Sequence, residues 1–305
     1  MFSRAQVPSP DSLSLSRRRM LLGAGVTAGA LFGALPAAAS GAQAATARPA
    51  TAYDVSVAPD TITAPAAVPS GPVTFNVGTA TAGGLALPLV KLRVPVAKYL
   101  ADLNTLSKAA TPAEAAAAEA AVEAGAVNLG GGVVQPGTGV AFTQILTPGT
   151  YHLVAYDFDG TDVHPVAHTL TVKGPASGSP PDAVDCFAHT PTGFDVPGGR
   201  LKAAGTHYVV NRSGLLNEAV LIPVRPGTTA AGIDAFFEAL RGGTQPPSYP
   251  LIGGPVGLPP LSPNRSALLT TSLAPGGYLL SSWITSTTTG HSRALDGFYK
   301  LVTLT

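Results

Sequence analysis

The stretch LTPGTYHLVAYDFDG at residues 146–160 is matched by LAPGGYLLSSWITST at residues 273–287. Both open with Leu-x-Pro-Gly-x-Tyr, in which a Pro-Gly turn leads into a strand. Further upstream, residues 73–106 and 206–240 also match in pattern, and each then runs through a Gly-rich stretch into one of the quoted endings. A repeated order of strand, turn, strand, short helix, loop and strand predicts two copies of one fold.

The helix of each copy is predicted from apolar side chains spaced mostly three or four residues apart. They are Val96, Leu100, Leu103 and Leu106 in the first copy and Ile233, Phe236, Phe237 and Leu240 in the second. This spacing places them on one face of an amphipathic helix. Elsewhere, short segments of alternating side chains bounded by Gly and Pro are typical of strands, as at residues 73–77.

An alanine-rich tract, residues 109–126, occurs in the first copy alone. Thr111 stands where an N-cap is needed, Pro112 would be the first helical residue, and Glu114 follows three residues after the cap. The tract therefore predicts an inserted helix. Because its side chains are mostly alanine with three glutamates, we expect a solvated arm that buries little area.

The first 44 residues have the features of an export signal. Ser16 precedes three arginines, which are followed by Met-Leu-Leu and a weakly apolar Gly/Ala run, a pattern typical of a bacterial twin-arginine signal. Ala-Gln-Ala at residues 42–44 predicts cleavage before Ala45. The alternative is an uncleaved anchor, since residues 21–39 are nearly long enough to cross a bilayer. Cleavage predicts a secreted, extracytoplasmic protein with no membrane span.

The charge of the chain limits the classes of partner it can bind, and its cysteine content limits the disulfides it can form. The whole chain has a formal net charge of +1, and the signal takes away four arginines and one aspartate. Since Lys and Arg are not clustered in the remainder, nucleic acid is excluded as a partner. The lone cysteine, Cys186, rules out an intramolecular disulfide, and its neighbour Phe187 favours a buried apolar thiol.

The segment KGPASGSPPDA at residues 173–183 is rich in Gly, Ser and Pro and too poor in apolar groups to pack. We therefore predict a first domain at residues 53–173, a linker at residues 174–183 and a second domain at residues 184–305.

The order in each half, with Leu-x-Pro-Gly-x-Tyr leading into a strand, resembles the cupredoxin-like β-sandwich of small extracytoplasmic copper proteins. The resemblance covers nearly the whole chain after residue 44. It implies a mainly β protein of two tandem antiparallel Greek-key β-sandwiches, each with a short helix. In that family a cysteine thiolate, two histidines and usually a methionine hold copper, because a soft thiolate with two imidazoles and a weak axial sulfur suits electron transfer.

The resemblance also assigns the ligand positions, and most of them carry other residues here. In the second half the positions fall near Asn217 and at Ser282, His291 and Phe298. In the first half they fall near Leu87, at Ala155, near His164, and at Ala167 or His168. Without a thiolate at Ala155 or Ser282, neither domain can build a blue-copper centre.

Three histidines remain candidates for copper or another metal: His164, His168 and His291. In an extended segment four residues span about 13 Å, so His164 and His168 could share an ion only if the chain turned at Pro165. His291 lies among Thr, Gly and Ser and is expected in a surface loop. We therefore assign no catalytic, cofactor-binding or metal-binding residue.

No nucleophile elbow, H-E-x-x-H or P-loop lysine occurs in the sequence. The sequence thus favours a non-enzymatic protein of two degenerate cupredoxin-like domains that binds or scaffolds an unknown extracellular ligand or protein. The alternative is a divergent metal-binding or metal-delivery protein, using the three candidate histidines. A third hypothesis is an enzyme with an unrecognised site between the domains, where pockets commonly form.

Overall fold

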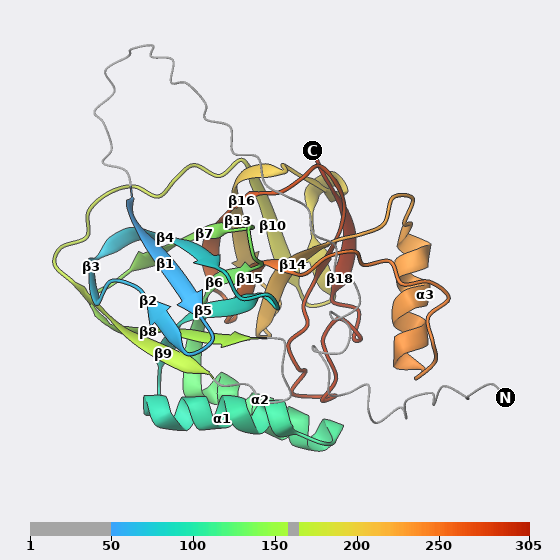
Figure 1. The fold of residues 1–305 in the computed structure, drawn as a ribbon, viewed down its shortest axis with the longest axis horizontal. Coiled ribbons are helices and arrows are strands. Elements are labelled where there is room, and N and C mark those ends of the chain that lie inside the picture. Colours follow the sequence, from blue (N-terminus) through green and yellow to red (C-terminus); the bar gives the residue numbers. More distant parts are fainter. Residues whose placement is uncertain (1–49, 158–164) are drawn as a thin grey trace, which may run out of the picture.

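A computed structural model describes residues 50–157 and 165–305 (Figure 1). The predicted signal at residues 1–44 and the candidate His164 lie outside the described residues. The strands of the first half are β1 (Thr51–Ala58), β2 (Thr61–Thr63), β3 (Ala67–Pro69), β4 (Gly71–Thr79), β5 (Leu85–Leu92), β6 (Ala126–Val134), β7 (Val140–Leu146), β8 (Gly149–Asp157) and β9 (Val166–Lys173). Those of the second half are β10 (Asp185–Thr190), β11 (Gly193–Asp195), β12 (Arg200–Leu201), β13 (Ala204–Asn211), β14 (Asn217–Pro223), β15 (Val256–Leu261), β16 (Ser266–Ser272), β17 (Gly276–Ser281) and β18 (Tyr299–Leu304).

The strands form two sheets, and both sheets run through both halves of the chain. One has eight strands in the order β11-β10-β13-β16-β7-β4-β1-β2, and the other has ten in the order β12-β18-β17-β14-β15-β6-β5-β8-β9-β3. The halves meet where β16 pairs with β7 and where β15 pairs with β6, both antiparallel. Most pairs are antiparallel, while β1–β4, β3–β9, β10–β13 and β12–β18 are parallel.

The strand order on one side of each junction mirrors the order on the other side. Outward from the junction of the smaller sheet, the first half runs β7, β4, β1, β2 and the second half runs β16, β13, β10, β11. The larger sheet repeats this with β6, β5, β8, β9, β3 against β15, β14, β17, β18, β12. Residues 174–183 connect β9 to β10, and the Ser177 N–H donates to the Ser70 carbonyl over 3.3 Å. The division into domains stays a prediction.

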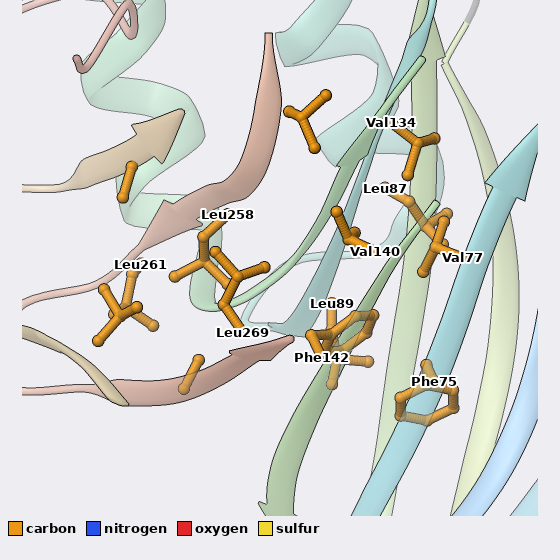
Figure 2. Close-up of a cluster of buried hydrophobic side chains, with 14 of the residues drawn as sticks. Phe75, Val77, Leu87, Leu89, Val134, Val140, Phe142, Leu258, Leu261 and Leu269 are labelled. Carbon is orange, nitrogen blue, oxygen red and sulfur yellow. The ribbon is translucent and has the colours of Figure 1, made fainter. Parts of the chain in front are cut away.

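The main core lies between the two sheets and is continuous across the halves. Alternate residues of the strands point into it, because successive side chains of a strand point to opposite faces of its sheet. Phe75 and Phe142 stack with ring centroids 5.1 Å apart. Phe142 in turn pairs with Leu269 of the second half, and Figure 2 shows these side chains in the same cluster. The fold is therefore the mainly β sandwich that the sequence predicts.

Three helices cover the outer face of the ten-stranded sheet: α1 (Val96–Lys108), α2 (Pro112–Gly125) and α3 (Ala230–Arg241). Figure 1 shows α1 and α2 side by side and α3 apart from them. The apolar face of α3 packs on the sheet through Phe236 and Phe237, as its spacing predicts. In the described part of the chain, no helix has the length and apolarity to span a bilayer.

The alanine-rich tract forms α2 with the predicted cap. Thr111 Oγ1 accepts from the Glu114 N–H over 3.2 Å, and the Glu114 carboxylate accepts from the Thr111 N–H over 3.1 Å. The expectation of a solvated arm is wrong, because Val122 and Glu119 are buried and α2 packs beside α1. Small alanine side chains let the helix lie close to its neighbours, so a sequence that buries little area per residue still packs.

Two contacts join α2 to the second half. The turn at Gly290 lies so close to the Pro112 backbone that a Cβ at this position would overlap it. Glu123 accepts from Arg293 at 3.5 Å, and Arg293 belongs to the loop between β17 and β18. The helix that is unique to the first half therefore lies against the second.

Cys186 is exposed, so the predicted buried thiol is wrong. It lies on β10, where successive side chains point to opposite faces of the sheet. Its neighbour Phe187 takes the inward place and is buried, which turns Cys186 outward. Adjacency to an apolar residue in sequence therefore indicated the wrong face.

Candidate functional site

Three of the four ligand positions assigned to the second half gather at one end of its sandwich. Asn217 begins β14, Ser282 directly follows β17, and Phe298 directly precedes β18. All of them are buried, and Asn217 and Ser282 have no exposed surface at all. The fold thus brings these positions to one end of the half, with polar but uncharged side chains at two of them.

Ser282 is held by hydrogen bonds to its neighbours. Its Oγ accepts from the Glu218 N–H over 3.2 Å, and its own N–H donates to the Phe298 carbonyl over 3.0 Å. The hydroxyl therefore joins β14 to the end of β17, where the family would place a metal-bound thiolate.

The Glu218 carboxylate is buried beside Ser282, with 4 % of the residue exposed. Its Oε1 accepts from the Trp283 N–H over 2.7 Å, a short bond typical of a charged acceptor. Its backbone carbonyl lies 3.1 Å from Nε2 of His189 on β10. Because a carbonyl can only accept, His189 must carry its proton on Nε2 to make this bond.

Burial lowers the pKa of His189 to about 4, although hydrogen bonds to the Glu218 and Val210 backbones oppose the shift. The imidazole is therefore neutral near pH 7. Reasoning from the sequence missed both His189 and Glu218. The available signal was the alternation along β10, which places His189 on the same inward face as Phe187.

A second chain of hydrogen bonds fixes Asn217. Its Nδ2 donates to Ser213 Oγ over 2.8 Å, and Ser213 Oγ donates to Asn211 Oδ1 over 2.6 Å. Asn211 in turn donates to the Leu261 carbonyl over 2.6 Å. Within the described residues, Asn217 Oδ1 is buried without a partner. The side chain that stands near a metal-ligand position thus braces the loop before β14.

In the first half, the positions that match Asn217 and Ser282 are apolar. Pro88 faces Gly131 as Val220 faces Gly257, and the two glycines have φ of 145° and 150°. Counting back from these pairs, Leu85 matches Asn217, so the assignment of Leu87 was displaced by two residues. The β8 position, Ala155, is buried in the main core.

Two of the candidate histidines, His168 and His291, lie within the described residues, in different elements of the fold. His168 lies on β9 with Nε2 3.0 Å from the Pro65 carbonyl. His291 is half-buried in the loop between β17 and β18, where its N–H donates to Thr289 Oγ1 over 3.3 Å. Across residues 50–157 and 165–305, no three His, Cys, Asp or Glu side chains are close enough to hold one metal ion.

One further polar cluster has the order of a hydrolytic triad. His207 Nδ1 lies 3.5 Å from the Asp185 carboxylate, and its Nε2 lies 3.2 Å from Thr271 Oγ1. Burial lowers the pKa of His207, and the Asp185 charge opposes this shift. Both His207 and Thr271 are buried within the sandwich, so a substrate cannot reach the hydroxyl. The cluster joins three neighbouring strands instead.

No family model matches the sequence, and no curated protein matches it either. Among solved structures, auracyanin B is similar at 16 % identity over 41 % of this chain and 91 % of that chain, with a TM-score of 0.24. A multicopper oxidase is similar at 12 % identity over 83 % of this chain and 88 % of that chain, with a TM-score of 0.22. A laccase from Botrytis aclada is similar at 10 % identity over 85 % and 54 %, with a TM-score of 0.22. Scores this low carry no argument about function.

Proposed function

We propose that this chain is an exported, non-enzymatic protein whose two cupredoxin-like units bind or scaffold an extracellular ligand or protein without a blue-copper centre. The observation that carries the proposal is the state of Ser282. It occupies the thiolate position, is fully buried, and is engaged by Glu218 and Phe298. A neutral hydroxyl lacks the soft, charged sulfur on which that type of copper site depends.

The mirrored strand order supports an origin by duplication. Gly131 and Gly257 stand at matching points of β6 and β15, each with a φ that favours glycine and each pressed against the partner strand's backbone. Two copies that keep such a backbone feature while the ligand positions differ are best explained by retention of the scaffold and loss of the metal site.

Metal analysis tests the proposal directly. The exported full chain is incubated with Cu(I), Cu(II) or Zn(II), desalted and assayed for bound metal, beside His164→Ala, His168→Ala and His291→Ala variants. We expect bound metal well below one ion per chain in every sample. Stoichiometric, tightly held metal that is lost in one of these variants would overturn the proposal in favour of a metal-handling protein.

The non-enzymatic part of the proposal needs a separate test. We expect no oxidation of phenolic substrates and no hydrolysis of ester or glycoside substrates by the purified chain. Turnover that a Thr271→Val variant abolishes would identify the Asp185–His207–Thr271 cluster as catalytic and overturn this part.

A further inference from the structure

A cavity of about 300 Å³ opens between the two halves. The first half contributes Arg93, Glu123 and Val127, from the end of β5 and the junction of α2 with β6. The second half contributes Leu216, Pro263 and Arg265. The site is therefore complete only when the two halves are joined.

Positive charge predominates in this cavity, which has two arginines and one glutamate among its lining residues. Both arginines are exposed, and in the described part of the chain neither guanidinium has a hydrogen bond or an ion pair. The carboxylate of Glu123 is already engaged by the buried Arg293 at 3.5 Å. Two free guanidinium groups thus face a cavity whose only carboxylate already has a cation beside it.

The second half carries an arginine at the position that matches Arg93. By the register of Pro88 and Val220, Arg93 matches Arg225, and both backbone N–H groups donate over 2.8 Å, to Gly125 and Pro250 carbonyls respectively. The Arg225 side chain donates through Nε to the Tyr249 carbonyl over 2.9 Å. Arg93 has the same backbone anchor, but no described residue accepts a hydrogen bond from its side chain.

The other arginine sits on a fixed turn. The Arg265 N–H donates to the Ser262 carbonyl over 3.2 Å, and its carbonyl accepts from the Asn211 N–H over 2.9 Å. Asn264, directly before it, holds a φ of 58°, a left-handed conformation that is uncommon outside glycine. Because the backbone is already restrained on both sides of Arg265, it would lose little conformational entropy when a ligand binds.

We propose that this cavity binds a small organic anion, with Arg93 and Arg265 holding its carboxylate or phosphate group and Val127, Leu216 and Pro263 contacting an apolar body. Guanidinium groups match both anions because they offer paired N–H donors in one plane. The volume is at the small end for ligand pockets, which limits the body to about one ring. The inference rests on the proposed binding role of the chain.

Isothermal titration and NMR with four probes test the site: benzoate, phenyl phosphate, the neutral benzamide and inorganic phosphate. We expect benzoate or phenyl phosphate to bind at least about tenfold more tightly than benzamide and inorganic phosphate. We also expect Arg93→Gln and Arg265→Gln each to weaken that binding by about tenfold or more. The control Arg200→Gln, at the exposed β12 edge, should leave it unchanged.

The inference is overturned if benzamide binds as tightly as benzoate and phenyl phosphate, if no probe binds, or if Arg200→Gln weakens binding as much as the cavity variants do. If inorganic phosphate binds as tightly as phenyl phosphate, the proposed contact between the cavity and an apolar ligand body is wrong. Thermal melting of each variant checks that folding is intact. Because metal binding is measured separately and involves neither arginine, failure here is distinguishable from failure of the proposed function.

Discussion

The N–H of Trp283, the residue directly after Ser282, donates to the Glu218 carboxylate over 2.7 Å. The bond joins the buried Glu218 side chain on β14 to the segment that directly follows β17. Glu218 also holds Ser282 through its backbone N–H and lies beside His189 through its carbonyl. Stability of this end should therefore depend on Glu218 more than on any candidate metal ligand.

We expect Glu218→Ala to lower the free energy of unfolding by about 3 kcal/mol, because it leaves the buried Trp283 N–H without its acceptor. Glu218→Gln keeps an acceptor oxygen and should cost about 1 kcal/mol. Urea denaturation measures both. The exposed Glu238→Ala is the control and should cost less than about 0.5 kcal/mol, since its ion pair with Arg241 is solvated. Equal small losses in all three variants would contradict this role.

The buried His189 predicts a loss of stability in mild acid. Its pKa in the folded chain, about 4, lies below the ordinary value of 6.5, so the unfolded chain binds the proton more readily. The stabilisation is complete above pH 6.5 and is lost as the pH falls through that value toward 4, amounting to about 3 kcal/mol. Denaturation at a series of pH values checks this. The His189→Asn variant should lack that part of the pH dependence, and an identical slope in both proteins would refute it.

Gly290 tests the contact between α2 and the second half. Its φ of 70° nearly equals the 73° of Gly137, but a Cβ at Gly290 would strike the Pro112 backbone, whereas a Cβ at Gly137 would meet nothing within 4 Å. Gly137→Ala should therefore cost about 1 kcal/mol, for backbone strain alone. Gly290→Ala should cost about 3 kcal/mol, because the helix must shift as well. Similar melting temperatures for the two variants would show that α2 does not rest on this turn.

The pair of Arg293 and Glu123 is a buried cation with one carboxylate. The Arg293 side chain is 4 % exposed, and within the described residues its Nε has no partner. Burial raises the pKa of Glu123, and Arg293 opposes the shift. We expect Glu123→Gln to lower the free energy of unfolding by about 3 kcal/mol, because it leaves the guanidinium buried without a counter-charge.

The matched variant is Glu123→Gln combined with Arg293→Met, which removes both charges. It should recover most of the lost stability, since a buried pair can be replaced by apolar groups at little cost. A double-mutant cycle by urea denaturation gives the coupling energy. Additive losses would mean that the two side chains do not act on one another.

Much of the local structure could be predicted from the sequence. The Pro-Gly turns before Tyr151 and Tyr278, the spacing of apolar residues in α3 and the capping signal at Thr111 all depend on neighbours within a few positions. Such features are encoded in short stretches, and each appears in the structure where expected. The exposure of Cys186 could not be read this way, because the face of a strand depends on which alternate residue the core takes.

Less of the candidate site than of the fold could be predicted from the sequence. The positions of Ser282 and Asn217 followed from the resemblance, but their surroundings did not. The Glu218 N–H donates to Ser282, Ser213 accepts from Asn217, and His189 reaches the Glu218 carbonyl from β10, a distant strand. No pattern in one segment identifies a buried carboxylate whose donor lies on another strand. The same is true of Arg93 and Arg265, which face one cavity from opposite halves of the chain.

By itself, the sequence determined the repeated order of strands, turns and helices, because turn chemistry and apolar periodicity act over a few residues. Only the tertiary structure decided that the halves share two continuous sheets, through β7 with β16 and β6 with β15. It also decided that α2 packs on the ten-stranded sheet instead of projecting into solvent. A cavity with two arginines opens where the two halves meet. The shared sheets and the cavity arise from contacts between residues more than a hundred positions apart, whose pairing depends on how whole surfaces fit together.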